Sequence, residues 1–458
     1  MKMPIRFGAS LAAAVMALGL VAVRAQAPYV YAITGARLVT VSGATIPSGT
    51  IVLRNGLIEA VGAGVQTPAD AVKIDGTGLT VYPGLIDMGT STGLDVQVPS
   101  EAPENIREAD DLERWKRGVI LRPNLMAAEH VKQTTPDLGR MAATGITTVL
   151  AVPPGTIFKG QSALMNVMGA DPRPIVGAIA EPVSGTAIVK APVALHVGMP
   201  NGVRVGDAYP DSLLGVIAFI RQSFIDGQYQ QMLEQRYQKS PAGQPRPAFD
   251  PALDALQPAL DRRLPVAFEA ELAREILRGL RMAKEFNLDP IVVGGWEADQ
   301  VEADLKAQRA RVIYSLDFPT RSKALAPDAP EPARELRLRA QAPKTPAALQ
   351  QAGITFAFSS DGLDKPQDFI ANAAKTVKAG LPADAAIRAL TLNAATIAGA
   401  ADRLGSLDRG KIANLVVTDG DLLADGTHVK QVFIDGRMID LAPLTEGSGP
   451  QRRGRGAR

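Results

Sequence analysis

Three side chains near the ends of apolar segments could together perform hydrolytic chemistry. His196, Glu269 and Asp361 lie in or directly after segments that are typical of buried strands. One imidazole and two carboxylates are enough for a catalytic zinc with an open position. Without a metal, Asp361 could pair with Glu269 or Glu271 as acid and base, provided that burial separates their pKa values. Glu271 could instead open the helix that follows, where negative charge is favoured.

The scarcity of histidine and cysteine limits this chemistry. The chain of 458 residues has no cysteine, which excludes disulfides, thiolate metal sites and a cysteine nucleophile. It has three histidines. We expect His130, in a predicted helix, and His428, in a terminal β region, to be surface or capping residues. His196 is the one histidine near a strand end, and it is either a ligand or a buried pocket residue.

The overall composition indicates a globular protein. Hydrophobic residues make up 46% of the chain and charged residues 21%. The net charge of +2 is too small to suggest a nucleic-acid partner or a membrane surface.

The two ends of the chain differ from the rest. Residues 1–27 combine a basic start, an apolar run at 11–23 and a small-residue pattern at 25–27, which predicts a signal peptide. An uncleaved anchor is the alternative. We therefore expect an exported protein, periplasmic or secreted, without a membrane span after cleavage. Residues 446–458 are rich in glycine and arginine and are predicted to be a disordered basic tail.

Strand patterns occur near both termini. Asn55-Gly56 and Asp435-Gly436 each separate two apolar runs, which is a strong hairpin signal. Either half alone would expose a long strand edge, so we predict one discontinuous β-sandwich made of residues 28–82 and 405–445. The segments that read as strands are 36–41, 50–54, 57–61, 72–75, one within 405–419, and 429–439.

Between these ends, strand and helix patterns alternate. The length of the region, 83–404, favours a closed (β/α)8 barrel of the TIM type in an α/β fold, with its site at the carboxyl ends of the strands. Two segments, 101–116 and 228–263, interrupt the alternation and are either lids or surface insertions. The predicted strands are 85–88, 147–152, 193–197, 265–269, 289–294, 311–315 and 354–359, with helices at 271–286 and 347–352.

Several short motifs carry a family resemblance in their order along the chain. The chain resembles the amidohydrolase superfamily, in particular its imidazolonepropionase-like and prolidase-like exported branch. The resemblance implies a composite β-sandwich with a (β/α)8 barrel, and a metal-dependent hydrolase of C–N bonds in amides or dipeptides. The motifs are 55–62, 82–87, 145–149, 160–163, 283–286, 295–298, 359–362, 392–395 and 405–411.

The resemblance also implies where metal ligands would stand. Gly89 and Ser91 occupy the positions of the first histidine pair, and Gly294 occupies that of a later histidine. His196 stands where the family often has a carboxylated lysine, and the run 269–271 replaces another segment with histidine. Only Asp361 matches a functional position unchanged.

Two functional hypotheses follow. The favoured one is a degenerate, metal-free homologue with little activity. It would bind a small molecule or act as a partner subunit, in a homo-oligomer or with an intact paralogue. The alternative is an active hydrolase with a site rebuilt from His196, Glu269 and Asp361, which would use zinc or another divalent metal.

Overall fold

The computed structural model describes most of the chain. It covers residues 30–99, 101–132, 136–167, 188–203, 208–326, 328–360, 363, 365 and 367–441. The predicted signal peptide 1–27, the predicted tail 446–458 and Asp361 lie outside the described residues, so their roles remain predictions. Within the described part of the chain, no helix is both long and apolar enough to cross a membrane.

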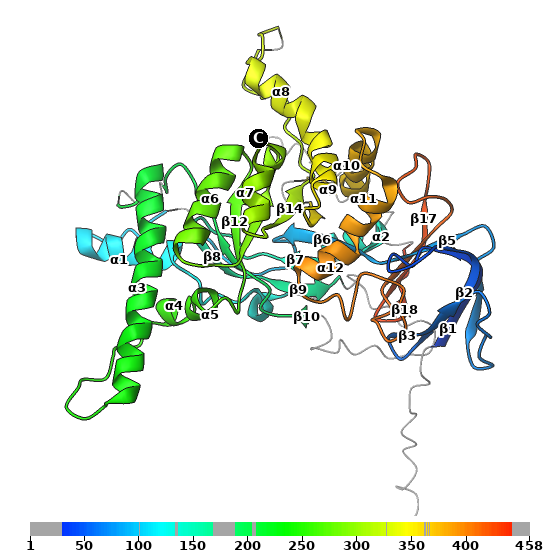
Figure 1. The fold of residues 1–458 in the computed structure, drawn as a ribbon, viewed down its shortest axis with the longest axis horizontal. Coiled ribbons are helices and arrows are strands. Elements are labelled where there is room, and N and C mark those ends of the chain that lie inside the picture. Colours follow the sequence, from blue (N-terminus) through cyan, green and yellow to red (C-terminus); the bar gives the residue numbers. More distant parts are fainter. Residues whose placement is uncertain are drawn as a thin grey trace, which may run out of the picture.

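Strands from both ends of the chain form one sheet, at the right of Figure 1. Its order is β18-β17-β16-β5-β1-β2-β3, and β4 pairs with β1. The two ends of the chain meet where β16 runs antiparallel to β5. The strands are β1 (Val30–Leu38), β2 (Ile46–Arg54), β3 (Leu57–Gly62), β4 (Val72–Asp75), β5 (Thr80–Pro83), β16 (Leu415–Thr418), β17 (Val429–Ile434) and β18 (Arg437–Met438).

Both predicted hairpins are present in this terminal sheet. Asn55 and Gly56 have φ angles of 52° and 81°, and Asp435 and Gly436 have 50° and 68°. Positive φ at both central residues is what a two-residue type I′ turn requires, and it favours Asn-Gly and Asp-Gly pairs.

A second group of strands forms a barrel-like body, at the centre of Figure 1. One sheet has the order β15-β14-β13-β12-β11-β8 and the other β10-β9-β7-β6. β11 to β15 are parallel neighbours, as is the pair β6 and β7. The strands are β6 (Leu85–Thr90), β7 (Ile146–Ala151), β8 (Phe158–Gln161), β9 (Ala163–Asn166), β10 (Ile188–Lys190), β11 (Leu195–Val197), β12 (Val266–Ala270), β13 (Pro290–Gly294), β14 (Arg311–Ser315) and β15 (Phe356–Ser359).

The predicted (β/α)8 barrel, whose strands would all run parallel, is wrong for one stretch. β8 is antiparallel to β11, and β9 is antiparallel to β7, with Ser162 between β8 and β9. The loop that joins β7 to β8 is short and contains no helix. A parallel connection needs a crossover of about a dozen residues or more, whereas an antiparallel one does not. Among the described residues, β15 and β6 are joined by side-chain hydrogen bonds and not by a backbone ladder.

Side chains alternate between the two faces of β12. Phe268 packs outward with Phe224 and Met282, which belong to α3 and α6. Ala267 packs on the opposite face with Ile291, in a cluster that also contains the interior residues of β14 and β15. Because strand residues point alternately to opposite faces, Glu269 lies on the same inner face as Ala267.

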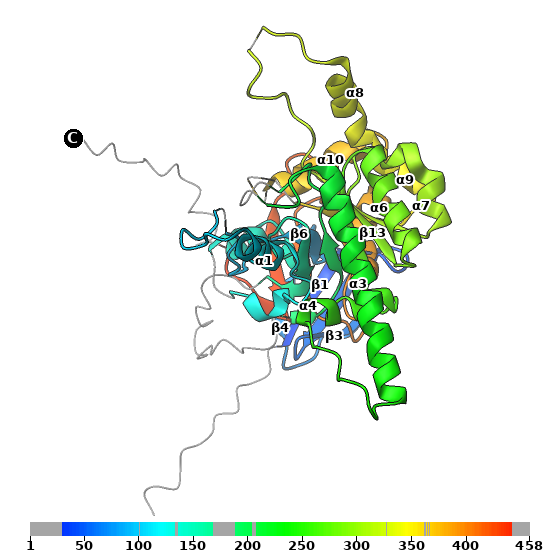
Figure 2. The same cartoon turned by 90° about the vertical axis from the view of Figure 1, so that its left-hand side faces the viewer.

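Helices surround this body. They are α1 (Ala109–Ile120), α2 (Pro136–Ala143), α3 (Leu213–Lys239), α4 (Pro251–Asp254), α5 (Gln257–Leu260), α6 (Ala273–Glu285), α7 (Glu302–Ala307), α8 (Ala333–Gln341), α9 (Thr345–Gln351), α10 (Gln367–Lys378), α11 (Ala383–Leu390) and α12 (Leu392–Ile397), with 3-10 turns at Ala127–His130, Ala298–Val301 and Ala342–Lys344. Figure 2 shows α3 running beside the body and extending beyond it.

The two interrupting segments are partly built into the core. Lys116 of α1 is fully buried and donates hydrogen bonds to the backbone oxygens of Val203, at 2.7 Å, and Ala208. In the segment 228–263, Leu256 and Ala259 are buried against the outer side of the strands. Both segments therefore contribute buried residues to the packed interior.

Candidate functional site

His196 lies deep on the inner face of the barrel body. Its partner in the parallel register between β11 and β12 is Ala267. Glu269 is two residues further along β12, so it lies one pleat, roughly 6–7 Å, closer to the carboxyl ends of the strands. The carboxyl ends of β11 to β15 lie at one edge of the body, and we call this edge the barrel mouth. The structure therefore places Glu269 nearer to the mouth and His196 below it.

The imidazole of His196 is buried and neutral. Its side chain is 1% exposed, and Nε2 lies 2.9 Å from Oγ of Ser162. Burial, with a smaller contribution from the positive charge of Lys159, lowers the pKa of His196 from 6.5 to about 3. Ser162 Oγ also donates to the backbone oxygen of Ala194, at 3.3 Å, which favours the tautomer with a proton on Nε2 of His196. Its Nδ1 is then a buried acceptor without a described partner.

Glu269 forms an ion pair with Lys159 of β8. The two side chains are 27% and 17% exposed, so solvent reaches the pair although it is mostly enclosed. A β-carbon added at Gly198, on β11's extension, would lie 3.1 Å from Oε2 of Glu269. The carboxylate therefore lies between β8 and the end of β11, with an ammonium group as its counter-ion.

Asp87 connects the first strand of the body to the segment after the last one. Its carboxylate is fully buried. It accepts hydrogen bonds from the backbone N–H of Ser360 at 2.8 Å, from the Ser360 hydroxyl at 2.5 Å and from the N–H of Gly89 at 3.2 Å. The Ser359 hydroxyl donates to the backbone oxygen of Gly89 at 3.3 Å. Asp87 thus sets the position of the chain immediately before Asp361.

The predicted degenerate positions differ in their surroundings. Gly89 is buried within β6, whereas Ser91 is exposed after the strand ends. Gly294, the last residue of β13, has a φ of 108°, and a β-carbon there would lie 3.0 Å from the backbone oxygen of Ala270. A histidine at position 294 would be strained in this backbone.

Glu271 does not begin the helix, which corrects one expectation. α6 starts at Ala273. The Glu275 carboxylate accepts from the N–H groups of Glu271 and Leu272, both at 3.2 Å, and Glu297 accepts from that of Ala273 at 2.9 Å. The negative charge at this helix terminus comes from Glu275 and Glu297.

The described side chains do not fit a divalent metal of the kind that the family usually binds. No three His, Cys, Asp or Glu residues in the described part of the chain are grouped so that they could hold a metal ion. Glu269 is paired with an ammonium group, and His196 Nε2 is engaged by Ser162. The structure brings Glu269 and His196 to the same inner face but at different depths, and Asp361 lies outside the described residues.

Sequence reasoning missed Lys159 and Ser162 as site residues. Phe158 and Lys159 belong to a short strand that the apolar pattern does not predict, because Gly160 and Ser162 interrupt it. The sequence offers one signal for Lys159: it lies between a phenylalanine and a glycine, directly before the motif at 160–163.

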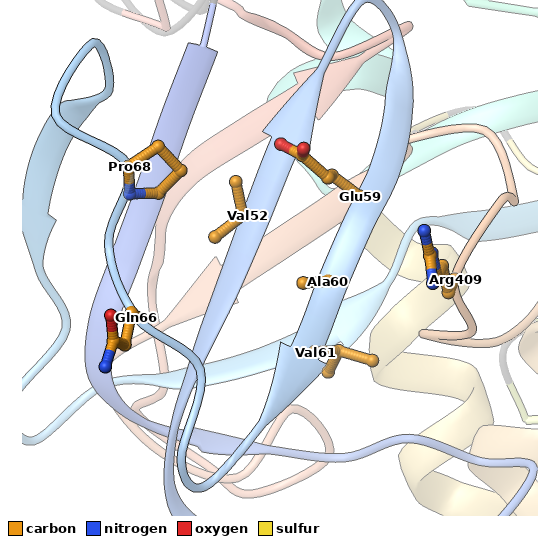
Figure 3. A pocket seen from close by; sticks show the side chains of 7 residues that line it. All are labelled: Val52, Glu59, Ala60, Val61, Gln66, Pro68 and Arg409. Atoms are coloured by element: carbon orange, nitrogen blue, oxygen red, sulfur yellow. The ribbon is translucent and has the colours of Figure 1, made fainter.

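A surface hollow lies away from these residues, on the terminal sheet. It has a volume of about 420 Å³. Figure 3 shows that its charged side chains, Glu59 and Arg409, come from β3 and from the loop before β16. Its lining is Val52, Glu59, Ala60, Val61, Gln66, Pro68 and Arg409. None of the predicted site residues lines this hollow.

Comparison with known proteins shows similarity to amidohydrolases. The family model described as "Amidohydrolase family" matches residues 303–439. Amidohydrolase tasK from Hapsidospora irregularis is 24% identical over 411 residues, which are 85% of this chain. The chain spans 39% of that relative's length.

Solved structures show the same fold. An amidohydrolase from Thermotoga maritima MSB8 is 24% identical, with a TM-score of 0.71, over 90% of this chain and 99% of that one. A Xaa-Pro dipeptidase with bound methionine in its active site is 18% identical, with a TM-score of 0.54, over 90% of this chain and 100% of that one. The family match, the relative and the shared fold together support a relation of this chain to the amidohydrolase superfamily.

Proposed function

We propose that this chain is a metal-independent member of the superfamily that binds a small molecule at the barrel mouth and hydrolyses it slowly or not at all. The observation that carries this proposal is the ion pair between Lys159 and Glu269. It lies on the inner face, at the strand ends where barrels of this type carry their sites.

The chemistry of an ammonium group supports binding over hydrolysis. In metal-dependent hydrolases, the metal lowers the pKa of a bound water so that hydroxide is available at neutral pH. The Lys159 ammonium is a single positive charge with three donors. It can polarise a carbonyl oxygen, but it does not ionise water at neutral pH. A divalent ion at Glu269 would have to displace Lys159 or lie beside its like charge.

The alternative, an active hydrolase built from His196, Glu269 and Asp361, needs these groups to converge. His196 lies one pleat deeper than Glu269, and its Nε2 is hydrogen-bonded to Ser162. This geometry favours a core role for His196 over a ligand role.

Metal analysis and turnover assays test the proposal. We expect the purified full chain to contain far less than one equivalent of zinc or manganese, and to turn over neither cyclic imides nor dipeptides. Lys159→Met should raise zinc uptake in a calorimetric titration, because it removes the ammonium group that is paired with Glu269. Lys132→Met removes an exposed lysine that is paired with Asp95, and it should behave as wild type. Stoichiometric metal in the wild type, or turnover that Asp361→Ala abolishes, would instead support the alternative.

A homo-oligomer also remains a proposal, and α3 offers a surface for a second copy. Ile225, Tyr229 and Met232 are 46%, 57% and 52% exposed and lie about one helical turn apart. Asp226 and Arg236 are each five residues from Gln231, so an antiparallel pair of α3 helices centred on Gln231 would place them opposite each other.

Light scattering tests this assembly. We expect the full chain to be dimeric at micromolar concentration and Tyr229→Glu to be monomeric. Gln235→Glu, an added charge at another exposed position of α3, should remain dimeric. A monomeric wild type would contradict the proposal.

A further inference from the structure

Arg122 is a partly buried cation without an acidic partner among the described residues. Its Nη2 donates to the backbone oxygen of Pro154 at 2.5 Å, and its Nη1 to that of Gln97 at 3.4 Å. Its Nε is buried and has no hydrogen-bond partner in the described part of the chain. The described contacts of Arg122 therefore include no carboxylate. Burial lowers the pKa of Arg122, and no described neighbouring charge opposes this effect.

Backbone contacts place Arg122 beside the barrel mouth. The N–H of Arg122 donates to the backbone oxygen of Phe158 at 3.1 Å, and Leu121 forms a parallel bridge to Phe158. Phe158 is the residue before Lys159. The guanidinium is thereby held next to the strand that supplies the Lys159 ammonium.

A glycine separates the two cations. A β-carbon at Gly155 would lie 2.8 Å from Arg122 Nη2 and 3.2 Å from both Cα and Cγ of Lys159. Any side chain at this position would fill the space between Arg122 and Lys159. The next residue, Thr156, has a buried hydroxyl without a described hydrogen-bond partner.

The two cations of this cluster differ in their described partners. Lys159 is paired with Glu269, whereas the described side-chain contacts of Arg122 are backbone oxygens. A planar guanidinium matches a carboxylate in geometry and charge. A partly buried donor without a hydrogen-bond partner lowers the stability of a protein, and a ligand that accepts from this donor removes the penalty.

We propose that Arg122 and Thr156 bind the carboxylate of a small monocarboxylate ligand at the barrel mouth. This inference rests on the proposed binding function and names the class of its ligand. The Arg122 guanidinium and the Thr156 hydroxyl donate to the carboxylate, and the Lys159–Glu269 pair contacts the polar remainder of the ligand.

The test compares a carboxylate with its uncharged amide. N-acetylglycine should bind to the full chain and raise its melting temperature, whereas N-acetylglycinamide should do neither. Arg122→Gln should weaken N-acetylglycine binding on the order of tenfold to a hundredfold, because a charge-assisted pair is lost. Arg107→Gln removes an exposed arginine of the same region and should leave binding unchanged.

The melting temperature without ligand shows whether Arg122 has a binding role or a structural one. Without ligand, Arg122→Gln should melt at the wild-type temperature or above, because it removes an uncompensated charge. A large fall in melting temperature, with carboxylate binding intact, would overturn the inference. So would equal binding of acid and amide, or tighter binding of inorganic phosphate. These outcomes are independent of metal content and turnover, so the proposed function and this inference can fail separately.

Discussion

Replacing Asp87 with alanine should lower the free energy of unfolding by about 3–5 kcal/mol. The carboxylate is fully buried, and its hydrogen bonds include two from Ser360 and one from the N–H of Gly89. Its removal leaves buried donors unpaired and releases the contact between β6 and the chain after β15. Urea unfolding, followed by circular dichroism, measures the loss.

Two further variants test whether the loss of stability comes from the hydrogen bonds of Asp87. Ser360→Ala removes the hydrogen bond from the Ser360 hydroxyl to Asp87 and should cost about 1–2 kcal/mol. Asp425→Ala removes an exposed carboxylate that is paired with Lys378, and it should unfold almost as wild type. If Asp87→Ala were as stable as Asp425→Ala, Asp87 would not hold the two strands together.

The second large effect concerns pH. Stability should fall by about 1.4 kcal/mol per pH unit, from His196 alone, as the pH drops below about 6.5 toward 3. In the folded protein, burial and the charge of Lys159 hold the pKa of His196 at about 3. The unfolded chain takes up a proton near pH 6.5. Since the unfolded state binds more protons in this window, stability rises with pH there and is fully present above it.

Unfolding at a series of pH values isolates this contribution. The difference in unfolding free energy between wild type and His196→Gln should shrink by about 3 kcal/mol between pH 7 and pH 4.5. Gln235→Asn changes an exposed side chain without a titratable group, and its difference from wild type should stay nearly constant. Parallel curves for wild type and His196→Gln would show that His196 protonates without cost in the folded state.

The similarity to amidohydrolases and the residues of the site lead to different expectations about function. The fold and the family match imply a hydrolase of the usual kind, and fold alone does not carry activity. The described residues at the barrel mouth instead pair a lysine with a glutamate and include an arginine without a described counter-ion. Such a site is suited to recognising a negatively charged group.

The strand pattern shows how far the fold can be predicted from residue order alone. The predicted strands 72–75 and 311–315 match the bounds of β4 and β14. The stretch of β8 and β9 is not predicted, and its antiparallel direction cannot be read from the pattern. Strand direction depends on which neighbour a strand pairs with, and residue alternation is the same in both directions.

Residue identity alone establishes some features of the site. The chain has three histidines, and Gly89, Ser91 and Gly294 carry no imidazole, because what a side chain lacks is evident from its type. Other features depend on packing. Glu269 pairs with Lys159, and Arg122 has no described acidic partner. These relations join segments that are far apart in the chain, and no residue pattern contains them, because they arise only when β8, β11 and β12 pack together.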